Sequence, residues 1–516
     1  FLEDMIKGWL TVAGGFLIHI VLGSLYCWAN LTSAITSRIR VYQPETTYND
    51  TLIVFAAALA AQGLTIFLGG ILGQKFGASF TCLIGGYTLV LGTFLSSIAT
   101  SLEFLVFTDG ILFGIGLGIC YTSPISCAIR WLPTRKGLVT GIIVGGFGCG
   151  AFFFGNLATY LVNPNSEAVS KSGPNMRYYS YDSKVVERVP FMFQMLAVAY
   201  FISITLGCLL ISEPPQLIEH QDVKQSRYQV TNTEDEEFAS PGIEVMKKPT
   251  WGIELQESNK PSIVIEASPV VNPMTTKKDF TMAVFGHQNN NHGNYMKVDN
   301  DITILTDKEL NISSKEMIEL PLFWHITSCF VTTTVGGMYI AGTFKTFGQE
   351  SFSDESFLAS ISSISAIFNA IGRIAWGFLA DRIGPLRTLY ILSLMFAVIM
   401  ATYAMSPKLG ELAFVIWTFA IFFFEGGNFV LYVPIMVQQF GSKYSASNYG
   451  LMFSVYSIFV VLNITVLSDF QFEFVLASRL MAMLTFVGFI NLLFLGRRIA
   501  LRKTTTDSKL SNCKLT

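Results

Sequence analysis

Twelve long apolar runs constrain the fold of this chain more than any other feature of its sequence. A helix needs about 20 mainly apolar residues to cross roughly 30 Å of hydrocarbon, and it satisfies its own backbone hydrogen bonds there. Hydrophobic residues make up 51% of the chain and charged residues 14%, whereas soluble domains carry about 25% charged residues. The expected spans are 8–31, 52–73, 79–99, 104–129, 137–162, 191–211, 322–344, 357–379, 388–405, 412–437, 449–467 and 474–495. The sequence therefore predicts an all-α membrane protein with twelve transmembrane helices.

The runs form two sets of six, separated by a polar stretch. This stretch holds the acidic run 233–237 and an Asn/His-rich patch at 289–292, and it is poor in aromatic residues. Such a composition is typical of disordered segments. We therefore expect an N-terminal six-helix bundle at 1–213, a largely disordered cytoplasmic linker at 214–320, a C-terminal six-helix bundle at 321–497 and a cytoplasmic tail at 498–516.

The charges of the short loops predict the orientation of the chain. An even number of spans places both termini and the linker on one membrane side, whose short loops hold Lys75, Arg130, Arg135, Lys136, Arg382, Arg387 and Lys443. Basic loops face the cytoplasm, so both termini are expected there, although the loop 163–189 opposite also holds four basic residues. The sequence leaves open whether the membrane is the plasma membrane or that of an organelle. Residue 1 is Phe rather than Met, so further residues are expected to precede it, and a targeting peptide among them stays open.

Charge and cysteine patterns argue against several other classes of protein. A formal net charge of −2 gives no support to a nucleic-acid partner. The eight cysteines stand singly, without a C-x-x-C pair, so neither a disulfide framework nor a metal site is expected. The sequence has no nucleophile elbow, P-loop or metal cluster. We expect neither an enzyme nor a cofactor.

Two loops match each other across the halves. Residues 70–77 read Gly-Ile-Leu-Gly-Gln-Lys-Phe-Gly and residues 377–384 read Gly-Phe-Leu-Ala-Asp-Arg-Ile-Gly, each after the second span of its half. Spans four and ten repeat a Gly and a Pro eight residues apart. Duplicated halves predict a substrate site near mid-membrane between the two bundles, as alternating access requires. The residues expected to act as gating loops are Gly70, Gln74, Lys75, Gly77, Gly377, Asp381, Arg382 and Gly384.

The loop repeat resembles the signature of the major facilitator superfamily, with Gln74 in place of the acidic residue in the first copy. Stretches at 121–150, 369–384 and 425–451 are similar to the oxalate/formate antiporters and their monocarboxylate-transporter relatives, and Tyr26-Cys-Trp28 resembles an aromatic pair of that branch. The resemblance covers both bundles but not the linker. It implies two pseudo-symmetric six-helix bundles that transport a small carboxylate.

Arg373 is the first candidate for substrate binding. It lies about two turns inside the cytoplasmic end of span eight, where a charged residue is costly unless it has a partner or a function. A guanidinium keeps its charge and can hold a carboxylate through two parallel hydrogen bonds. In the resembling families an arginine at this point of span eight is implicated in carboxylate binding. The alternative is a structural role, either in an ion pair with Asp381 or as a side chain that reaches to the interface.

His19 and Glu425 are the candidates for proton coupling. His19 lies near the middle of span one, and the ordinary pKa of histidine, about 6.5, suits proton transfer near neutral pH. Glu425 lies at the centre of span ten, where a lone carboxylate favours its protonated form. The alternatives are a neutral, hydrogen-bonded His19 and a Glu425 that is the counter-ion of Arg373. Asp109, near the outer end of span four, is expected to face interfacial water, and the alternative is a functional role.

Aromatic and amide side chains complete the predicted substrate site. Tyr26, Trp28 and Tyr121 offer ring faces together with hydroxyl or indole donors, and the alternative for each is packing or a place at the membrane interface. The resembling dicarboxylate antiporters carry a lysine in span eleven, which has no basic residue here, so a monoanion fits better than a dianion. A lysine and an aspartate of proton-linked monocarboxylate transporters correspond to Asn30 and Asn369. Asn369 belongs to the predicted substrate site, and any proton coupling must use other groups.

The sequence thus favours a carrier of small monocarboxylates such as pyruvate, lactate or formate, either proton-coupled or exchanging, whose transport unit is expected to be a monomer. A carrier of a larger acid such as pantothenate, or an oxalate/formate-type antiporter, remains an alternative. A different class is a nutrient sensor on the same scaffold that does not transport. Concentrative uptake would distinguish a carrier from a sensor.

Overall fold

The computed structural model describes residues 2–165, 167, 170–171, 177–214, 311–349, 351–352, 355–469 and 474–513. Apart from its two ends, the predicted linker at 214–320 lies outside the described residues, so its disorder stays a prediction. The last three residues of the predicted tail also lie outside them.

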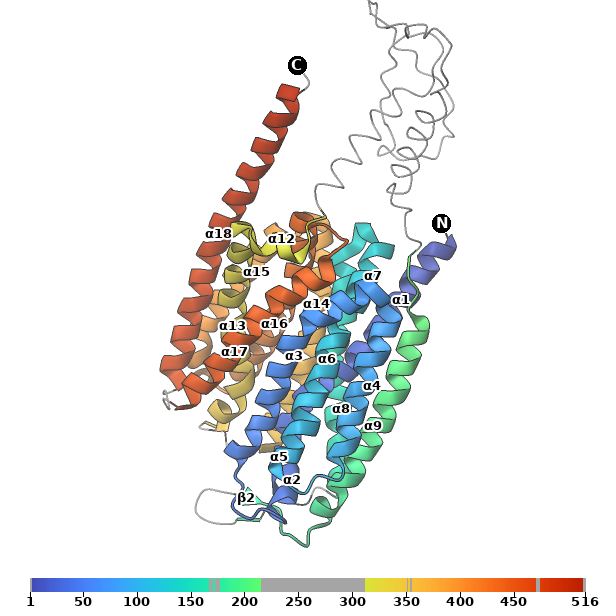
Figure 1. The fold of residues 1–516 in the computed structure, drawn as a ribbon. Coiled ribbons are helices and arrows are strands. Elements are labelled where there is room, and N and C mark those ends of the chain that lie inside the picture. The colour runs from blue at the N-terminus through green and yellow to red at the C-terminus, as the bar shows by residue number, and fades with distance from the viewer. Residues whose placement is uncertain are drawn as a thin grey trace, which may run out of the picture. The chain divides into compact units, whose positions relative to one another are not determined.

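The N-terminal half contains six membrane-spanning paths (Figure 1). Span one consists of α1 (Leu2–Leu22), the 3-10 segment η1 (Gly23–Cys27) and α2 (Trp28–Arg40), and spans two and three are α3 (Tyr48–Phe76) and α4 (Ala78–Ser96). Span four combines α5 (Leu102–Leu105), the π-helical segment η2 (Val106–Leu112), α6 (Phe113–Tyr121) and α7 (Ser123–Trp131). The short η3 (Pro133–Arg135) leads into span five, α8 (Lys136–Val162), and the strands β1 (Ser170–Lys171) and β2 (Arg177–Tyr178) precede span six, α9 (Lys184–Leu210).

The C-terminal half repeats this arrangement with fewer interruptions. A short helix, α12 (Ser314–Ile318), precedes spans seven and eight, which are α13 (Pro321–Gln349) and α14 (Glu355–Ile383). Span nine is α15 (Pro385–Thr402), extended by η4 (Tyr403–Leu409), and span ten is α16 (Glu411–Phe440). Spans eleven and twelve are α17 (Ser445–Asp469) and α18 (Phe474–Cys513). The helix α18 continues through most of the predicted tail.

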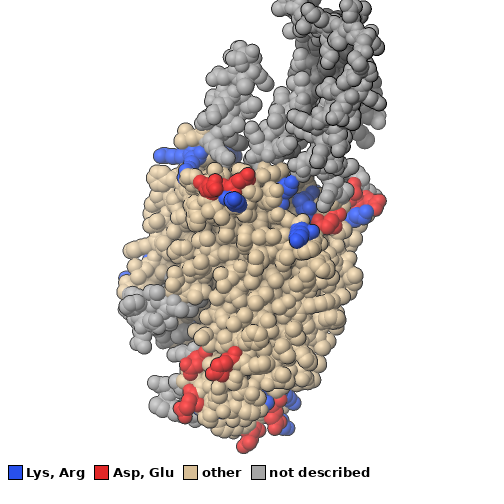
Figure 2. Space-filling model, in the orientation of Figure 1, with Lys and Arg blue, Asp and Glu red and all other residues tan. Residues whose placement is uncertain are grey.

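The outer surface suits a bilayer. On the face that Figure 2 shows, charged side chains gather at the two ends of the bundle and leave a wide uncharged belt between them. Within the described residues, eleven helices are long and apolar enough to cross a membrane. The remaining span, α13, is 29 residues long but less apolar, because threonines occupy its middle. The predicted all-α fold of twelve helices in two bundles is confirmed.

The two halves contact each other through reciprocal helix pairs. The second span of each half packs along the fifth span of the other, so that α3 lies on α17 and α14 lies on α8. Glycines permit the close approach: a Cβ added at Gly137 would collide with the carbonyl oxygen of Gly377, and one at Gly377 with that of Gly137. These contacts hold the halves together at the end of the bundle that carries the two repeated loops.

Candidate functional site

Arg373 lies on α14, facing the N-terminal half, and its side chain is only 3% exposed. Its Nε donates a hydrogen bond to Asn369 Oδ1 at 2.8 Å, and its Nη1 donates to the Val144 carbonyl oxygen at 3.2 Å. Asn369 is itself held by donation from Nδ2 to the carbonyl oxygen of Phe422 at 3.0 Å. The guanidinium carbon also lies about 5.5 Å from the ring centres of two phenylalanines, Phe147 and Phe429. Every one of these partners is neutral.

A cavity of about 30 Å³ adjoins Arg373 between the two halves. Its polar lining comes from both sides: Tyr26, Gln62 and Tyr121 from the N-terminal half, Tyr456 and Ser457 from α17. The Tyr456 hydroxyl has no hydrogen-bond partner among the described residues. The structure thus brings the predicted residues Arg373, Tyr26 and Tyr121 to one cavity, with Asn369 holding the arginine from behind. This volume holds no more than a few water molecules, so the cavity must widen to admit a substrate.

Arg373 has no acidic partner in the described part of the chain. The predicted structural alternative, an ion pair with Asp381, does not form, because both Asp381 oxygens accept backbone N–H groups of α8: Gly137 at 2.8 Å and Leu138 at 2.8 Å. Glu425 also makes no ion pair with Arg373. A buried guanidinium without a counter-ion is costly, and a bound anion is one means of offsetting that cost.

The two proton-coupling candidates lie near this cavity but do not line it. His19 is fully buried, with Nδ1 2.9 Å from the Gly15 carbonyl oxygen, which assigns the ring hydrogen to Nδ1. Its Nε2 has no partner in the described structure, and its ring centre lies 5.2 Å from that of Tyr121. Both Glu425 carboxyl oxygens are buried without a hydrogen-bond partner among the described residues, against Gly337 of α13. These positions leave the coupling roles of His19 and Glu425 as predictions.

Trp28 does not reach the Arg373 cavity, although the sequence analysis grouped it with Tyr26. Two residues along a helix differ by about 200° in direction, and by more in a 3-10 turn. Tyr26 therefore faces the cavity between the halves, whereas Trp28 lines a separate cavity inside the N-terminal half, together with Asp109. The place of Trp28 in the predicted substrate site is not supported by this geometry. Asp109 likewise faces this interior cavity, and not only interfacial water.

The two repeated loops lie at the same end of the bundle and each reaches the opposite half. Gln74 Nε2 donates to Ser447 Oγ, near the start of α17, at 2.8 Å. Gln74 thus contacts α17 in the way that Asp381, its counterpart in the repeat, contacts α8. Gly77 and Gly384 have φ angles of 85° and 93°, which favour glycine at both turns. Other loop residues lie close by: Gly70 contacts Ser447, and the charged ends of Lys75 and Arg382 lie over the rings of Phe76 and Phe378.

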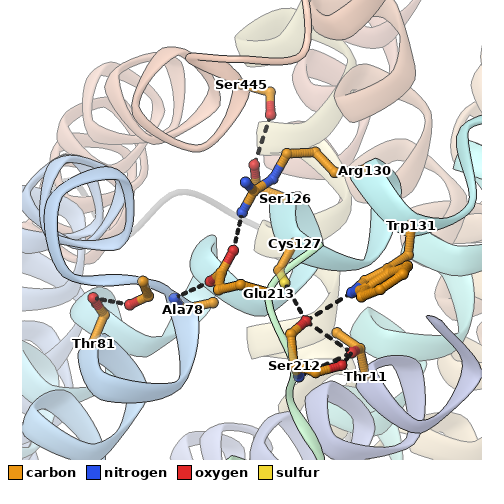
Figure 3. Close-up of polar contacts among 11 residues, drawn as sticks. Thr11, Ala78, Thr81, Ser126, Cys127, Arg130, Trp131, Ser212, Glu213 and Ser445 are labelled. Atoms are coloured by element: carbon orange, nitrogen blue, oxygen red, sulfur yellow. Dashed lines mark hydrogen bonds and ion pairs between the residues drawn. The ribbon is translucent and has the colours of Figure 1, made fainter. Parts of the chain in front are cut away.

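A polar cluster at the end of α9 was not predicted (Figure 3). Glu213 accepts from Arg130 Nη2 at 2.6 Å and from the Ala78 backbone N–H, while the Ser212 carbonyl oxygen accepts from Trp131 Nε1 at 2.7 Å. The cluster ties residues 212–213, just after α9, to spans one, three and four. The Arg130-Trp131 pair and the acidic residue just after span six were the available signals.

Other lining residues of the Arg373 cavity were also missed. Gln62, Phe429 and Tyr456 carry no charge, so nothing in the sequence separates them from packing residues. Phe147 lies within the glycine-rich stretch 145–150 that carried part of the family resemblance, and this was the one usable signal.

Comparisons with known proteins agree with this architecture. The sequence pattern of the Major Facilitator Superfamily matches residues 19–464. The chain is 24% identical to apicoplast pyruvate carrier 1 of Toxoplasma gondii over 86% of this chain and 80% of that protein. It is 31% identical to the oxalate:formate antiporter of Oxalobacter formigenes over 29% and 36% of the two chains, and 30% identical to monocarboxylate transporter 12-B of Danio rerio over 30% and 32%.

The fold is shared with solved transporters. The proton:xylose symporter XylE superposes with a TM-score of 0.63 at 12% identity, over 95% of each chain. The helices, the paired halves and the match over most of the sequence define a multi-pass membrane transporter and not an enzyme. This chain belongs to the Major Facilitator Superfamily.

Proposed function

We propose that this protein is a secondary active transporter of small monocarboxylates, of the pyruvate, lactate or formate type, that works by alternating access. The observation that carries the proposal is Arg373, a buried cation beside a cavity between the halves, without an acidic partner among the described residues. A carboxylate in this cavity would supply the missing negative charge and accept hydrogen bonds from the guanidinium. The relative named as a pyruvate carrier gives independent support for this substrate class.

A monoanion fits the charge of the site better than a dianion. Arg373 is the one basic side chain among the described residues that line the cavity. Tyr456 contributes a neutral hydroxyl from span eleven, and Tyr26 and Tyr121 add two more hydroxyls from the opposite half. A second carboxylate would thus lose its hydration without meeting a second cation.

We further propose that the repeated loops and both termini face the cytoplasm, that the monomer is the transport unit, and that transport is coupled to protons or to exchange. Basic residues in the short loops support this orientation. The described contacts between Gly137 and Gly377, and between Ser126 Oγ and Ser445 Oγ at 2.9 Å, close the loop side in this conformation. The substrate would then enter from the opposite side.

The test is counterflow in proteoliposomes that contain the purified full-length chain. Vesicles loaded with unlabelled pyruvate, lactate, formate, oxalate or pantothenate are diluted into traces of the labelled compound. We expect uptake with at least one small monocarboxylate and little with oxalate. Uptake with oxalate alone would favour an antiporter of dicarboxylates, and binding without any uptake would favour a sensor.

A further inference from the structure

The cavity that Trp28 and Asp109 line has no role in the proposed carboxylate site. Its volume is about 40 Å³, and it lies wholly inside the N-terminal half, among spans one to four and span six. Two of its walls depart from the regular α-helix: η1 in span one and η2 in span four. Short 3-10 and π segments inside long helices often mark functional positions.

Asp109 is the charged member of this cavity. It lies on η2, seven residues after the start of α5 and so about 10 Å along the helix. Its side chain has neither a hydrogen bond nor an ion pair among the described residues, and it keeps some exposed surface. Glu425 is by contrast 3% exposed and His19 fully buried. Of the three groups, Asp109 is the least buried.

No basic group is among the described residues that line the cavity around Asp109. The titratable side chains that face it across the cavity are the Cys27 thiol of η1 and the Tyr200 hydroxyl of α9, while α4 contributes Thr93. The lining residues from α3 and α6 are apolar. A metal ion would need several oxygen ligands, which this largely apolar lining does not provide. The ligand that fits a single carboxylate here is a proton.

Trp28 gives a second, independent sign of a ligand site. It is 8% exposed and lines the same cavity, and its Nε1–H has no hydrogen-bond partner in the described structure. A buried donor without a partner is destabilising, so such groups usually meet water or a ligand. The Asp109 carboxylate and the unpaired Trp28 Nε1–H lie around one cavity, so the surroundings of the indole should change when the carboxylate gains or loses a proton.

We propose that Asp109 is a proton-binding site inside the N-terminal half, linked to the Arg373 cavity through η1. The two cavities share this segment as a wall: Ser24 and Cys27 of η1 face Asp109, whereas Tyr26 of η1 faces Arg373. The Tyr26 hydroxyl also donates to Met338 Sδ of the C-terminal half at 3.7 Å. A change of charge at Asp109 that moves η1 therefore moves a residue of the carboxylate site and a contact between the halves. Proton binding stands by itself, while the link to transport rests on the proposed function.

The first experiment measures proton binding without any substrate. Tryptophan fluorescence of the detergent-purified full chain is followed from pH 4 to pH 9. We expect a pH-dependent component that is lost in Trp28→Phe and in Asp109→Asn and returns, at a shifted pH, in Asp109→Glu. Glu103→Gln is the matched control, because this exposed carboxylate lies six residues away, accepts from Gln43 and does not line the Asp109 cavity. Persistence of the component in a folded Asp109→Asn protein, judged by thermal unfolding, would overturn the proposal.

The second experiment measures coupling in proteoliposomes. A gradient of one pH unit can sustain about tenfold accumulation of a co-transported monoanion. We expect Asp109→Asn to lower the ratio of gradient-driven uptake to counterflow by about tenfold, and Glu103→Gln to leave it unchanged. A normal ratio in Asp109→Asn would refute the link to transport. If the unmodified protein moves no carboxylate, the proposed function fails, and the fluorescence experiment still decides whether Asp109 binds a proton.

Discussion

The loop after α14 and the loop after α3 occupy equivalent places in the two halves but hold the opposite half by different means. Asp381 places a carboxylate on two backbone N–H groups at the start of α8, where the helix dipole favours negative charge. Gln74 makes one neutral hydrogen bond to Ser447 at the start of α17. The sequence offset of 307 residues that relates Gln74 to Asp381 also relates Ile66 to Arg373 and Gln62 to Asn369. In each pair the charge, where there is one, lies in the C-terminal half.

This asymmetry separates the tasks of the halves. The C-terminal half supplies the charge at the proposed carboxylate site and, on the loop side, the carboxylate that accepts two backbone N–H groups of α8. The N-terminal half supplies neutral counterparts at these positions, and its own acid within a span, Asp109, lies in a cavity away from the interface. A single charge on one side of the central cavity suits a single negative charge on the substrate.

The largest effect is expected from Arg373→Ala, which removes the charge that distinguishes this position from Ile66. The substrate carboxylate would then be buried without a partner, at a cost of roughly 3–5 kcal/mol, or more than a hundredfold in apparent affinity. Arg373→Lys keeps the charge but loses the planar fork, so it should weaken affinity more than maximal rate. Uptake is normalised to folded protein, with the exposed Arg387→Ala as control. Near-normal saturation in Arg373→Ala would remove the main reason for an anionic substrate.

A smaller effect is expected from Asp381→Asn, which makes the C-terminal loop resemble the N-terminal one. Loss of the charge at the start of α8 should weaken closure of the loop side by about 1–2 kcal/mol, or roughly 5–30-fold in the equilibrium. Closure can be measured as the rate of disulfide formation between cysteines placed at Ser126 and Ser445, whose hydroxyls lie 2.9 Å apart. Six native cysteines are buried, and the control for background is the same chain with Cys149 and Cys513 replaced by serine. If the double-cysteine protein forms the disulfide at the same rate with and without Asp381→Asn, the Asp381 charge does not stabilise closure of the loop side.

The smallest effect is expected from the reverse change, Gln74→Glu, which gives the N-terminal loop a charge without altering its length. A carboxylate at the start of α17 should favour closure by about 0.3–1 kcal/mol and raise the same cross-linking rate by roughly twofold to fivefold. Gln74→Leu is the matched control that removes the hydrogen bond to Ser447 and adds no charge. A lower cross-linking rate in Gln74→Glu than in Gln74→Leu would contradict the helix-dipole argument.

Much of this organisation could be predicted from sequence, because it depends on residue type along single helices. The length of apolar runs defined the spans, and charge inside a span singled out Arg373 and Glu425. The direction in which a side chain points from its helix was harder to predict. The 3-10 segment η1 sends Tyr26 and Trp28 into different cavities, and no residue pattern in the sequence marks that segment as irregular.

Contacts between spans that are distant in the sequence were also not predicted. Asp381 was weighed as a partner for Arg373 because both lie on α14, whereas its actual partners are backbone groups of α8, which carry no sequence signal. For the same reason Tyr456 and Gln62 were not recognised as lining residues. Side chains that act through neutral hydrogen bonds look like ordinary packing until the helices are placed together.

The modest apolarity of α13 bears on how the protein is made. Insertion into a membrane is favoured by apolar residues and opposed by polar ones, so α13 should enter the bilayer less readily by itself than its neighbours. Within the helix, Thr327, Thr332, Thr333 and Thr334 donate their hydroxyls to backbone carbonyls of the preceding turn, which lowers the cost of burying them but adds little drive. The helix packs along α18, the last span to be synthesised. We therefore expect α13 to be stably inserted only after α18 has left the ribosome, so that the C-terminal half is completed late. Chains truncated before α18 should then be degraded, even though they contain every residue of the proposed carboxylate site.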